Sequence, residues 1–461
     1  MIEVKEILQL NADIVNGRHL TMKGFRSVSI DSRKTGRDIL FFAIKGENND
    51  GHRYIKELAK QKKIKAAVVN KSWYSKEGKS IKGCAIIIVR DTVKALGELA
   101  VIHRDLMNIP VAAIAGSNGK TTTKDLAAAV LSKKFNLHKT DGNFNNHIGL
   151  PLTLLGINAK HDFCLLEAGS NHFNELEYLC GIAKPDAALV TNIGREHLEF
   201  FKNLAGVAKE EFQVYDWVRK NGTVCFYGTD DDYIRKYSRK AKEDSFTYSY
   251  RYAADVKGRM EGYDRKFRPV ISYTYREKTY RTYVNTFGKH SFYNGLAAIA
   301  LGIYFGVSHK DISDALKNFS NGSGKRMQVE VMNGILVVND AYNSNPDSVK
   351  LGLETMKEYR TAGRKHIILA DMLEMGNAAP KEHLNNGKLA AGMKFDFLYT
   401  YGKESFRTFT GAKKLKNNFY FESKDDLAEF VKSNLRKGDL LYVKGSRGMK
   451  LEEAVAKIFK N

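Results

Sequence analysis

Residues 111–123 read Val-Ala-Ala-Ile-Ala-Gly-Ser-Asn-Gly-Lys-Thr-Thr-Thr, a short apolar run followed by two glycines, a lysine and hydroxyl side chains. The run Lys-Asp-Leu-Ala-Ala-Ala-Val, which favours a helix, comes next at residues 124–130. Glycines let backbone N–H groups close around a phosphate, and a helix N-terminus favours anions. The stretch predicts a buried strand, a phosphate loop and a helix, an arrangement typical of proteins that handle a nucleoside triphosphate.

Within this loop we expect Lys120 to pair with the β- and γ-phosphates and the Thr121 hydroxyl to reach Mg²⁺. The spacing departs from the commonest phosphate-loop pattern, because Ile114 stands five places before Gly119, where a glycine is usual. Gly116 and Gly119 alone frame the loop. On this motif alone, a glycine-rich turn with an incidental lysine remains an alternative.

The composition is that of a globular, multidomain chain. A length of 461 residues predicts two to four domains, and a hydrophobic content of 43% is sufficient for buried cores. The four cysteines form no Cys-x-x-Cys pair, which argues against a zinc ribbon and for a reducing compartment. No run of about 18 apolar residues occurs, and the N-terminus lacks a signal-peptide pattern. We expect a cytoplasmic protein with no membrane span.

The formal net charge of +22 needs an explanation. A basic balance can indicate nucleic acid, an anionic membrane face or a polyanionic substrate. The lysines are scattered through all regions, which favours a general lysine bias, with a phosphate-rich substrate next and nucleic acid last. A stretch rich in tyrosine and basic residues, 245–290, is interpreted in the same way, as half-buried strands of an antiparallel patch rather than an RNA contact.

Strand-then-helix patterns divide the chain into three segments. Residues 1–107 and 108–320 alternate apolar runs with helical patterns, and a glycine-rich joint at 320–324 precedes a third segment, 321–461, with the same rhythm. Apolar runs that end in a polar residue predict strands buried on both faces, with ligands at their carboxyl ends. The predicted strands are 39–44, 85–89, 111–115, 162–167, 187–192, 334–340, 365–371 and 439–444.

Polar residues follow two predicted strands of the middle segment. Glu167 ends one strand, and His197 follows the strand that ends at Asn192. A carboxylate and an imidazole near a phosphate loop suit metal ions that bridge a triphosphate. A single glutamate at a strand end is more often solvated, so the assignment depends on the whole set of motifs.

That set runs in order through all three segments and resembles the Mur ligase family over almost the whole chain. The motifs are Asp31-Ser32-Arg33, Phe41-Phe42-Ala43-Ile44-Lys45-Gly46-Glu47, Gly116-Ser117-Asn118-Gly119-Lys120-Thr121-Thr122, Gly142-Asn143-Phe144-Asn145-Asn146-His147, Glu167-Ala168-Gly169-Ser170-Asn171-His172, Thr191-Asn192-Ile193-Gly194 with His197-Leu198-Glu199, Asp340-Ala341-Tyr342-Asn343-Ser344-Asn345-Pro346, Asp371-Met372-Leu373-Glu374-Met375-Gly376 and Lys444-Gly445-Ser446-Arg447.

The resemblance implies an α/β protein of three domains. They are a smaller N-terminal α/β domain (1–107) that binds the UDP-sugar, a central phosphate-loop domain with a doubly wound, mostly parallel sheet (108–320) that binds ATP, and a C-terminal Rossmann-like domain (321–461) that closes on ATP and binds the incoming dipeptide. It also implies an ATP- and Mg²⁺-dependent amide ligase, acting as a monomer, that joins D-alanyl-D-alanine to a UDP-N-acetylmuramoyl-peptide through an acyl phosphate. Two Mg²⁺ ions and no nucleic-acid partner are expected.

Roles are carried over from the family by position. The residues expected to take part in catalysis are Lys120, Glu167, His197 and Arg326. The ATP-binding residues are Gly116, Ser117, Asn118, Gly119, Lys120, Thr121, Thr122, Asn294, Arg326 and Asp340. The metal ligands are Thr121, Glu167 and His197. Those expected to bind the other substrates are Ser32, Arg33, Lys45, Gly46, Asn145, Asn146, Asn343, Asn345 and Arg447.

One position departs from the family. Its carbamylated lysine stands fourteen places after the residue that matches His197, and here that place holds Glu211. We expect Glu211 to give the metal site a permanent carboxylate, with a water bridging the shorter side chain. A slip that restores Lys209 and a weakened or repurposed site stay open. Two residues along a helix turn a side chain by about 200°, so Lys209 is expected to face away from the metal side.

Smaller departures leave room for other functions, namely a paralogous amide ligase with another acceptor or a nucleotide-binding regulator without turnover. The basic charge adds a nucleic-acid-dependent ATPase as a further alternative. The residues that depart are Asn174, Ser291, Ala341 and Ala370.

Overall fold

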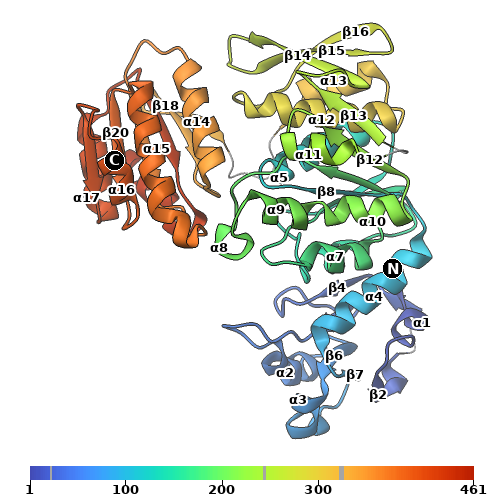
Figure 1. Cartoon of the computed structure of the whole chain (residues 1–461). Helices are drawn as coiled ribbons and strands as arrows, with labels where there is room; N and C mark the ends of the chain where they lie inside the picture. Colours follow the sequence, from blue (N-terminus) through green and yellow to red (C-terminus); the bar gives the residue numbers. More distant parts are fainter. Residues whose placement is uncertain (21–22, 242–244, 321–326, 461) are drawn as a thin grey trace.

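The computed structural model describes residues 1–20, 23–241, 245–320 and 327–460, and its strands form four sheets within those residues. Figure 1 shows three α/β units, which we call the N-terminal unit (blue), the central unit (cyan to yellow) and the C-terminal unit (orange and red). The central unit lies between the other two.

The N-terminal unit is built on a five-stranded sheet in the order β2-β7-β6-β5-β4. Strands β4 to β7 pair in parallel, and β2 lies antiparallel to β7. The predicted apolar runs 39–44 and 85–89 form β5 and β7. The elements are β1 (Ile2–Glu3), α1 (Val4–Ile7), β2 (Asp13–Val15), β3 (Gly24–Phe25), β4 (Ser27–Ser29), β5 (Ile39–Phe42), α2 (Ile55–Lys60), β6 (Ala66–Asn70), α3 (Lys71–Lys76), β7 (Ala85–Val89) and α4 (Thr92–Met107).

The central unit carries a nine-stranded sheet in the order β16-β15-β14-β13-β12-β11-β8-β10-β9. From β9 to β14 neighbouring strands are parallel, and β14, β15 and β16 pair antiparallel. Strand β8 lies between β10 and β11, which explains why its residues are all apolar and buried. The strands are β8 (Val111–Ala115), β9 (Leu137–Lys139), β10 (Phe163–Glu167), β11 (Ala187–Val190), β12 (Val224–Gly228), β13 (Ser245–Ser249), β14 (Val256–Tyr263), β15 (Pro269–Tyr275) and β16 (Lys278–Tyr283).

Helices cover both faces of this sheet. They are α5 (Lys120–Leu131), α6 (Gly149–Leu154), α7 (Glu175–Ala183), α8 (Leu198–Phe201), α9 (Leu204–Glu211), α10 (Gln213–Asn221), α11 (Asp232–Ser238), α12 (His290–Tyr304) and α13 (His309–Lys317).

The tyrosine-rich stretch 245–290 forms strands, as predicted, but only part of it is antiparallel. Strand β13 continues the parallel sheet from β12 to β14. The tyrosines largely pack on other rings of the chain: Tyr280 stacks on His309 with ring centroids 3.5 Å apart, and Tyr263 stacks on Phe267 at 3.8 Å. The aromatic residues in this stretch therefore serve packing within the unit.

The C-terminal unit has a six-stranded sheet in the order β17-β18-β22-β19-β20-β21. It is parallel except for the edge strand β17, which pairs antiparallel with β18 and was not among the predicted strands. The elements are β17 (Gln328–Met332), β18 (Ile335–Asp340), α14 (Pro346–Glu358), β19 (Lys365–Ala370), α15 (Ala379–Met393), β20 (Phe397–Tyr401), α16 (Ser405–Gly411), β21 (Asn418–Phe421), α17 (Lys424–Asn434), β22 (Leu440–Lys444) and α18 (Leu451–Phe459).

The apolar cores do not follow the three units one to one. One cluster of buried side chains runs from the N-terminal sheet through α4 to one face of the central sheet, where it includes Val111 and Val190. A second cluster fills the other face of the central sheet beneath α5 and α12. Each face of the C-terminal sheet carries a further cluster, and one of the two extends to the central unit. The N-terminal and central units therefore share one large core, whereas the central unit contributes three apolar side chains, Leu198, Phe267 and Phe287, to a cluster of the C-terminal unit.

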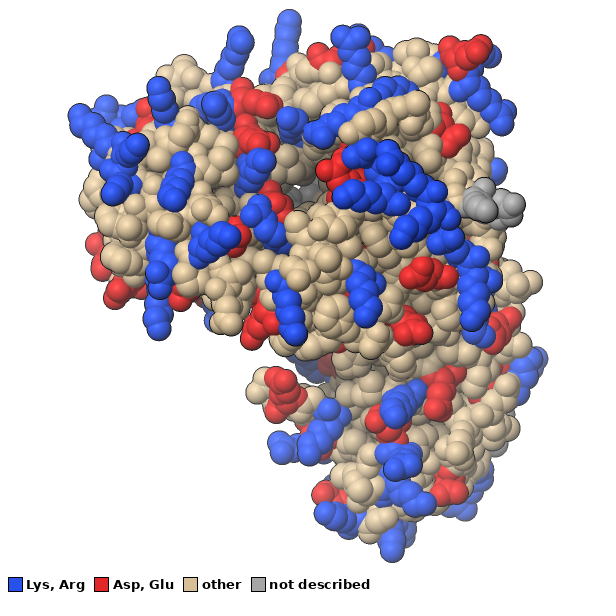
Figure 2. Space-filling model, viewed as in Figure 1, with Lys and Arg blue, Asp and Glu red and all other residues tan. Residues whose placement is uncertain are grey.

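Basic side chains are scattered over all three units on the face drawn in Figure 2, with acidic side chains among them. This scatter in space matches the scatter of lysines along the sequence. Of the helices within the described residues, none is long and apolar enough to cross a membrane.

Candidate active site

The phosphate loop joins the end of β8 to the start of α5. Both of its glycines have positive φ angles, +115° at Gly116 and +81° at Gly119. A Cβ atom at Gly116 would lie 2.3 Å from Thr191 Oγ1, and one at Gly119 would lie 2.5 Å from Asn294 Oδ1. Backbone conformation and close packing therefore both require glycine at these two positions.

The loop is held in place by the segment that follows β11. The Ser117 hydroxyl accepts a hydrogen bond from Gly194 N at 2.8 Å and donates to Gly194 O at 3.2 Å. The Thr191 hydroxyl and the Asn192 amide both donate to Asn118 O, at 2.7 and 2.8 Å. Because these bonds come from the segment that follows a neighbouring parallel strand, they define the shape of the loop without a ligand.

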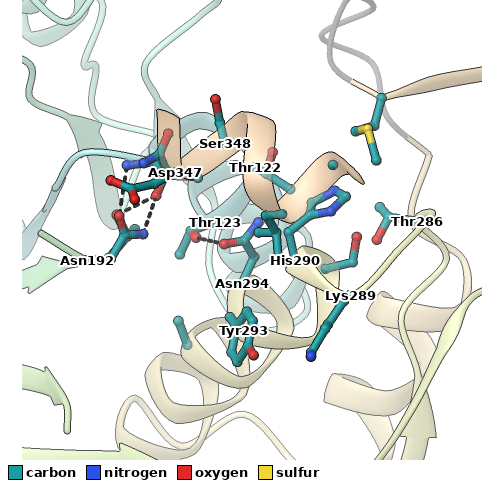
Figure 3. Close-up of a pocket in the computed structure, with 18 of the residues that line it drawn as sticks. Thr122, Thr123, Asn192, Thr286, Lys289, His290, Tyr293, Asn294, Asp347 and Ser348 are labelled. Carbon is teal, nitrogen blue, oxygen red and sulfur yellow. Dashed lines mark hydrogen bonds between the residues drawn. The ribbon is translucent and has the colours of Figure 1, made fainter. Parts of the chain in front are cut away.

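A cavity of about 1050 Å³ opens between this loop, α12 and the C-terminal unit. Figure 3 shows Thr122, Thr123 and Asn294 on one side of it and Asp347 and Ser348 of α14 across from them. Lining residues on the side of α12 include aromatic, imidazole and basic groups, which suit a nucleotide base and phosphates: Tyr250, Arg251, Phe287, Lys289, His290 and Tyr293.

Several residues expected to bind ATP or substrate line this cavity. Asn294 accepts a hydrogen bond from the Thr123 hydroxyl at 3.2 Å, and Asp340 and Asn343 approach from the end of β18. The buried Lys444 ammonium joins the last two, since it donates to Asp340 Oδ2 at 2.8 Å and to Asn343 O at 3.0 Å. The sequence motif that begins at Lys444 gave this residue no role. Its position at the end of a predicted strand is the signal that could have indicated one.

The loop lysine and two glutamates meet at the base of the loop. Lys120 Nζ donates to Gly116 O and lies 3.4 Å from Glu196 Oε2. Glu211 accepts a hydrogen bond from Gly116 N at 2.5 Å. Burial raises the pKa of Glu211 to about 8; the nearby Lys120 ammonium opposes this shift and the charge of Glu196 adds to it. Glu196 was missed by sequence reasoning, although it directly precedes the candidate ligand His197.

Glu211 and Lys209 occupy different sides of α9. Glu211 contacts the phosphate loop, whereas Lys209 Nζ lies 5.8 Å from the ring centroid of Phe173, on the other side of the helix. The expected rotation between the two side chains is therefore present in the structure.

The side chains around the loop are suited to coordinate a hard cation together with phosphate oxygens. Buried side-chain oxygens without a hydrogen-bond partner are a sign of an unmet ligand. No three His, Cys, Asp or Glu side chains within the described part of the chain form a ready metal cluster, but Mg²⁺ is usually held by one or two carboxylates, substrate phosphates and water. The unpartnered oxygens are Thr121 Oγ1, Glu167 Oε2, Glu196 Oε1 and Glu211 Oε1.

Glu167 is buried at the end of β10. Its Oε1 accepts a hydrogen bond from the Asn145 amide at 2.8 Å, and its Oε2 lies 3.9 Å from the buried Lys124 ammonium. Asn146 has a different task, because its side-chain oxygen accepts from Ile148 N and Gly149 N at the start of α6. Of the two neighbouring asparagines, Asn145 alone contacts Glu167.

His197 and its neighbours contact the C-terminal unit. His197 Nδ1 lies 3.0 Å from Glu374 Oε2, and this contact lowers the pKa of Glu374. Two residues earlier, the Arg195 guanidinium lies 2.7 Å from Asp347 Oδ1 and 3.0 Å from Glu382 Oε2.

Asn345 caps α14 and donates to Asn118 Oδ1 of the phosphate loop at 2.8 Å. These polar contacts place the C-terminal unit directly against the loop.

Other predicted residues lie away from the cavity. Arg33 pairs with Asp31 on the N-terminal unit and lowers the pKa of Asp31 to about 2. Ser32 belongs to the same turn, and Lys45 and Gly46 form a turn after β5. Arg447 pairs with Glu452 and lies 5.8 Å from the Tyr342 ring centroid. Arg326 lies outside the described residues.

Comparisons with known proteins cover the whole chain. Residues 25–104 match the model of the Mur ligase family catalytic domain, 114–302 the Mur ligase middle domain, and 325–447 the glutamate ligase domain of Mur ligases. The UDP-N-acetylmuramoyl-tripeptide–D-alanyl-D-alanine ligase of Bacillus subtilis is 33% identical over 98% of this chain and 97% of its own length. The Escherichia coli enzyme of the same name is 29% identical, covering 97% of both chains.

Solved structures show the same three-domain α/β fold. MurF from Acinetobacter baumannii superposes with a TM-score of 0.86 at 23% identity, over 100% of this chain and 99% of its own. MurF from Thermotoga maritima, solved in complex with ADP, has a TM-score of 0.81 at 22% identity, over 94% and 97% of the two chains.

Proposed function

Because this chain belongs to the Mur ligase family, we propose that it is an ATP-dependent amide ligase that adds D-alanyl-D-alanine to UDP-N-acetylmuramoyl-tripeptide in peptidoglycan precursor synthesis. The observation that carries this proposal is the cavity at the phosphate loop, which the central and C-terminal units line together. The full-length match to ligases of this name in two distant bacteria supports it.

The reaction proceeds in two chemical steps. An oxygen of the terminal peptide carboxylate attacks the γ-phosphorus of ATP, and ADP leaves with the electrons of the broken P–O bond. The amino nitrogen of D-alanyl-D-alanine then attacks the acyl phosphate carbon, inorganic phosphate leaves, and the nitrogen loses a proton. Phosphoryl transfer of this kind depends on positioning and on neutralising charge. Lys120 and the loop amides provide both at the phosphates, and Arg326 is a further cation in this proposal.

The bound nucleotide lies in the shared cavity. Asn294 faces its base, while Asp340, held by Lys444, faces the ribose from the C-terminal unit. The remaining loop residues Gly116 to Thr122 wrap the phosphates. Thr121, Glu167, His197 and Glu211 hold two Mg²⁺ ions, which supply positive charge to the phosphates when bound.

The two other substrates approach from opposite units. Ser32, Arg33, Lys45 and Gly46 of the N-terminal unit bind the UDP end, and the turns that carry them leave their backbone and side chains accessible. Asn145 lies beside Glu167, where the reacting carboxylate is expected. The residues assigned to the peptide and dipeptide on either side are Asn146, Asn343, Asn345 and Arg447.

This placement assigns one substrate to each domain. Domains at 1–107, 108–320 and 321–461 bind the UDP-sugar, ATP and the dipeptide, and the C-terminal domain shields the acyl phosphate from water, which otherwise hydrolyses it. The enzyme acts as a monomer in the cytoplasm, where its nucleotide substrates are found.

A direct assay tests the proposal. The purified chain is incubated with ATP, Mg²⁺, D-alanyl-D-alanine and UDP-N-acetylmuramoyl-tripeptide carrying either lysine or diaminopimelate, and phosphate release and product mass are followed. We expect pentapeptide product from one or both tripeptides. ATP binding without product from either tripeptide would contradict the proposal and favour a paralogue with another acceptor or a regulator.

Two variants make the assay specific to the phosphate loop. Lys120→Ala should lower the rate by about a hundredfold or more, because a charge that stabilises the transferring phosphoryl group is lost. Lys133→Ala, at an exposed position beyond the end of α5, is the matched control and should leave the rate unchanged. Equal rates in the two variants would show that phosphoryl transfer does not occur at this loop.

A further inference from the structure

Glu196 is a buried carboxylate that none of the motif-based assignments includes. Its side chain is 4% exposed, in the loop between β11 and α8. Its Oε2 lies 3.4 Å from Lys120 Nζ, and its Oε1 is buried without a hydrogen-bond partner. A buried side-chain oxygen without a hydrogen-bond partner is uncommon in folded proteins and indicates that a ligand binds there.

Glu211 reaches the same loop from a different element. It ends α9, is fully buried, and contacts Gly116 N through Oε2, while its Oε1 has no hydrogen-bond partner. Gly116 links the two carboxylates, because its N–H donates to Glu211 and its carbonyl oxygen accepts from Lys120, which contacts Glu196. Glu196 therefore faces the end of the phosphate loop at Lys120, and Glu211 faces its beginning at Gly116.

Two buried carboxylates, Glu196 and Glu211, and the loop lysine Lys120 meet at this place. Lys120 is the cation that contacts Glu196. The next nearest buried cation of the loop helix, Lys124, donates to Thr140 O at 2.8 Å and lies 3.4 Å from Asp125 Oδ1. Buried carboxylates are costly unless a cation or hydrogen bonds compensate them. Two carboxylates with one free oxygen each, beside a phosphate loop, provide what a hard divalent cation requires.

We propose that Glu196 and Glu211 together hold a divalent cation beside the phosphate loop, with Glu196 as an additional ligand of the site. All of the proposed donor atoms are oxygens, and none of them requires a covalent modification of the chain. A carboxylate made from lysine and CO₂ is therefore not needed in this protein. The inference rests on the proposed function only in taking ATP as the source of the phosphates that complete the coordination of the cation.

A competing role for Glu196 leads to a different result. Glu196 could serve only to hold Lys120 against the loop while no nucleotide is bound. Removing its charge would then release Lys120 and strengthen nucleotide binding in the absence of divalent cations. If Glu196 is a cation ligand, the same change weakens cation binding instead.

The test counts bound Mn²⁺ by electron paramagnetic resonance in the full chain with a non-hydrolysable ATP analogue. We expect Glu196→Gln and Glu211→Gln each to weaken one Mn²⁺ by at least about tenfold, the lower range for losing a group that supports a metal site. The double variant should bind one Mn²⁺ fewer than the original chain. Nucleotide affinity without Mn²⁺ is measured in parallel.

The matched control is Glu210→Gln, one residue before Glu211. Glu210 is also buried, but it accepts hydrogen bonds from Asn174 N and Leu176 N and faces away from the loop. This variant should keep the original Mn²⁺ count, and circular dichroism shows that each variant is folded. Glu196→Asp keeps the charge and should retain the cation more strongly than Glu196→Gln. An unchanged Mn²⁺ count in the double variant would overturn the inference.

A second measurement separates this inference from the proposed function. Ligase activity of the original chain should not depend on added bicarbonate, whereas Glu211→Lys should depend on it, because a lysine needs CO₂ to become a carboxylate. Bicarbonate dependence of the original chain would overturn the inference. A chain that makes no pentapeptide but loses one Mn²⁺ in the double variant would overturn the proposed function and leave the cation site in place.

Discussion

The central unit meets its two neighbours in opposite ways. Toward the N-terminal unit it is joined by helix α4, which packs against α1 and β6 on one side and α6 and α7 on the other. The buried side chains there form one continuous apolar cluster. Toward the C-terminal unit, ion pairs and hydrogen bonds such as that of Arg195 with Asp347 surround a large cavity, beside a small aromatic contact in which Phe267 and Phe287 pack on Tyr359. We call these the apolar seam and the polar seam.

The difference indicates which seam can open. Separating the apolar seam would expose a shared core, which costs free energy in proportion to the area exposed. Partly exposed ion pairs contribute little net stability and can exchange protein partners for water. A ligase must admit ATP and a dipeptide and then exclude water. A reversible seam at the cavity is useful for this, and a fixed seam at the N-terminal unit is compatible with it.

The largest expected effect comes from a buried ion pair within the apolar seam. His103 of α4 lies between Glu6 Oε2 at 2.7 Å and Ile157 O at 2.9 Å, and both side chains are almost fully buried. His103→Ala leaves the buried Glu6 carboxylate without its side-chain partner, although Oε1 keeps the hydrogen bond from Glu3 N, and should lower the free energy of unfolding by about 3 kcal/mol in urea denaturation. The double variant Glu6→Leu/His103→Leu should recover part of that loss, and no recovery would contradict the explanation.

Truncating the apolar seam itself should have the next largest effect. Leu99 of α4 is fully buried, and Leu99→Ala should cost about 2–5 kcal/mol through lost burial and a cavity. Leu353→Ala, the same truncation in the core of the C-terminal unit, is the matched comparison. Hydrogen exchange should show loss of protection in both the N-terminal and central units for Leu99→Ala, but in the C-terminal unit alone for Leu353→Ala. Identical patterns would show that the units are not distinct.

Acid should affect the C-terminal unit through His366. Burial lowers the pKa of His366 to about 4, against the opposing charge of Asp439. Since the unfolded chain binds that proton first, near the ordinary histidine pKa, stability falls as the pH drops from about 6.5 toward 4. Between pH 7 and 5 we expect a loss on the order of 2 kcal/mol in urea denaturation of the C-terminal unit.

His366→Gln should make that loss shallower, because no imidazole then has to be kept uncharged. His161→Gln serves as the comparison, since His161 is a histidine of the central unit. Equal acid sensitivity of the C-terminal unit in the original chain and in His366→Gln would assign the effect to other groups.

The smallest effect on stability is expected at the polar seam. Arg195 is one-third exposed, so its pairs with Asp347 and Glu382 are screened by solvent. A double-mutant cycle of Arg195→Ala and Asp347→Asn should give a coupling of about 1 kcal/mol or less in unfolding. The KM for ATP should nevertheless rise several-fold in Arg195→Ala, because the C-terminal unit closes less often.

Lys424→Ala removes a surface ion pair with Glu453 within the C-terminal unit and is the control for this measurement. It should leave the KM for ATP unchanged. A similar rise in both variants would mean that Arg195 has no special part in the seam.

The sequence was sufficient for the elements nearest the chemistry. The apolar runs at 111–115 and 162–167 form the buried strands β8 and β10, and two glycines with positive φ shape the loop between β8 and α5. These features depend on a few adjacent residues, whose pattern is visible in the chain. Strand β17 was not predicted although its sequence, Gln-Val-Glu-Val-Met, alternates polar and apolar residues. Its middle residues are exposed, and it has no apolar run of the kind that revealed the buried strands.

Part of the candidate site also could not be predicted from the sequence. Glu196, Lys444 and Arg195 gain their importance from partners far along the chain: Lys120 for the first, Asp340 for the second and Asp347 for the third. No spacing rule connects such pairs. Domain boundaries and the metal roles of Thr121, Glu167, His197 and Glu211 remain predictions that the experiments above address.

By itself, the sequence determined the family, the strand-and-helix order and the phosphate loop, because local patterns of apolar, glycine and polar residues encode them. The tertiary structure alone decided that α4 would join two units into one core, while ion pairs, hydrogen bonds and a small aromatic contact join the third. It also decided that two glutamates, from a loop and a helix end, would face the same phosphate loop. Burial and charge balance depend on every neighbour in space, and these neighbours exist only once the chain is folded.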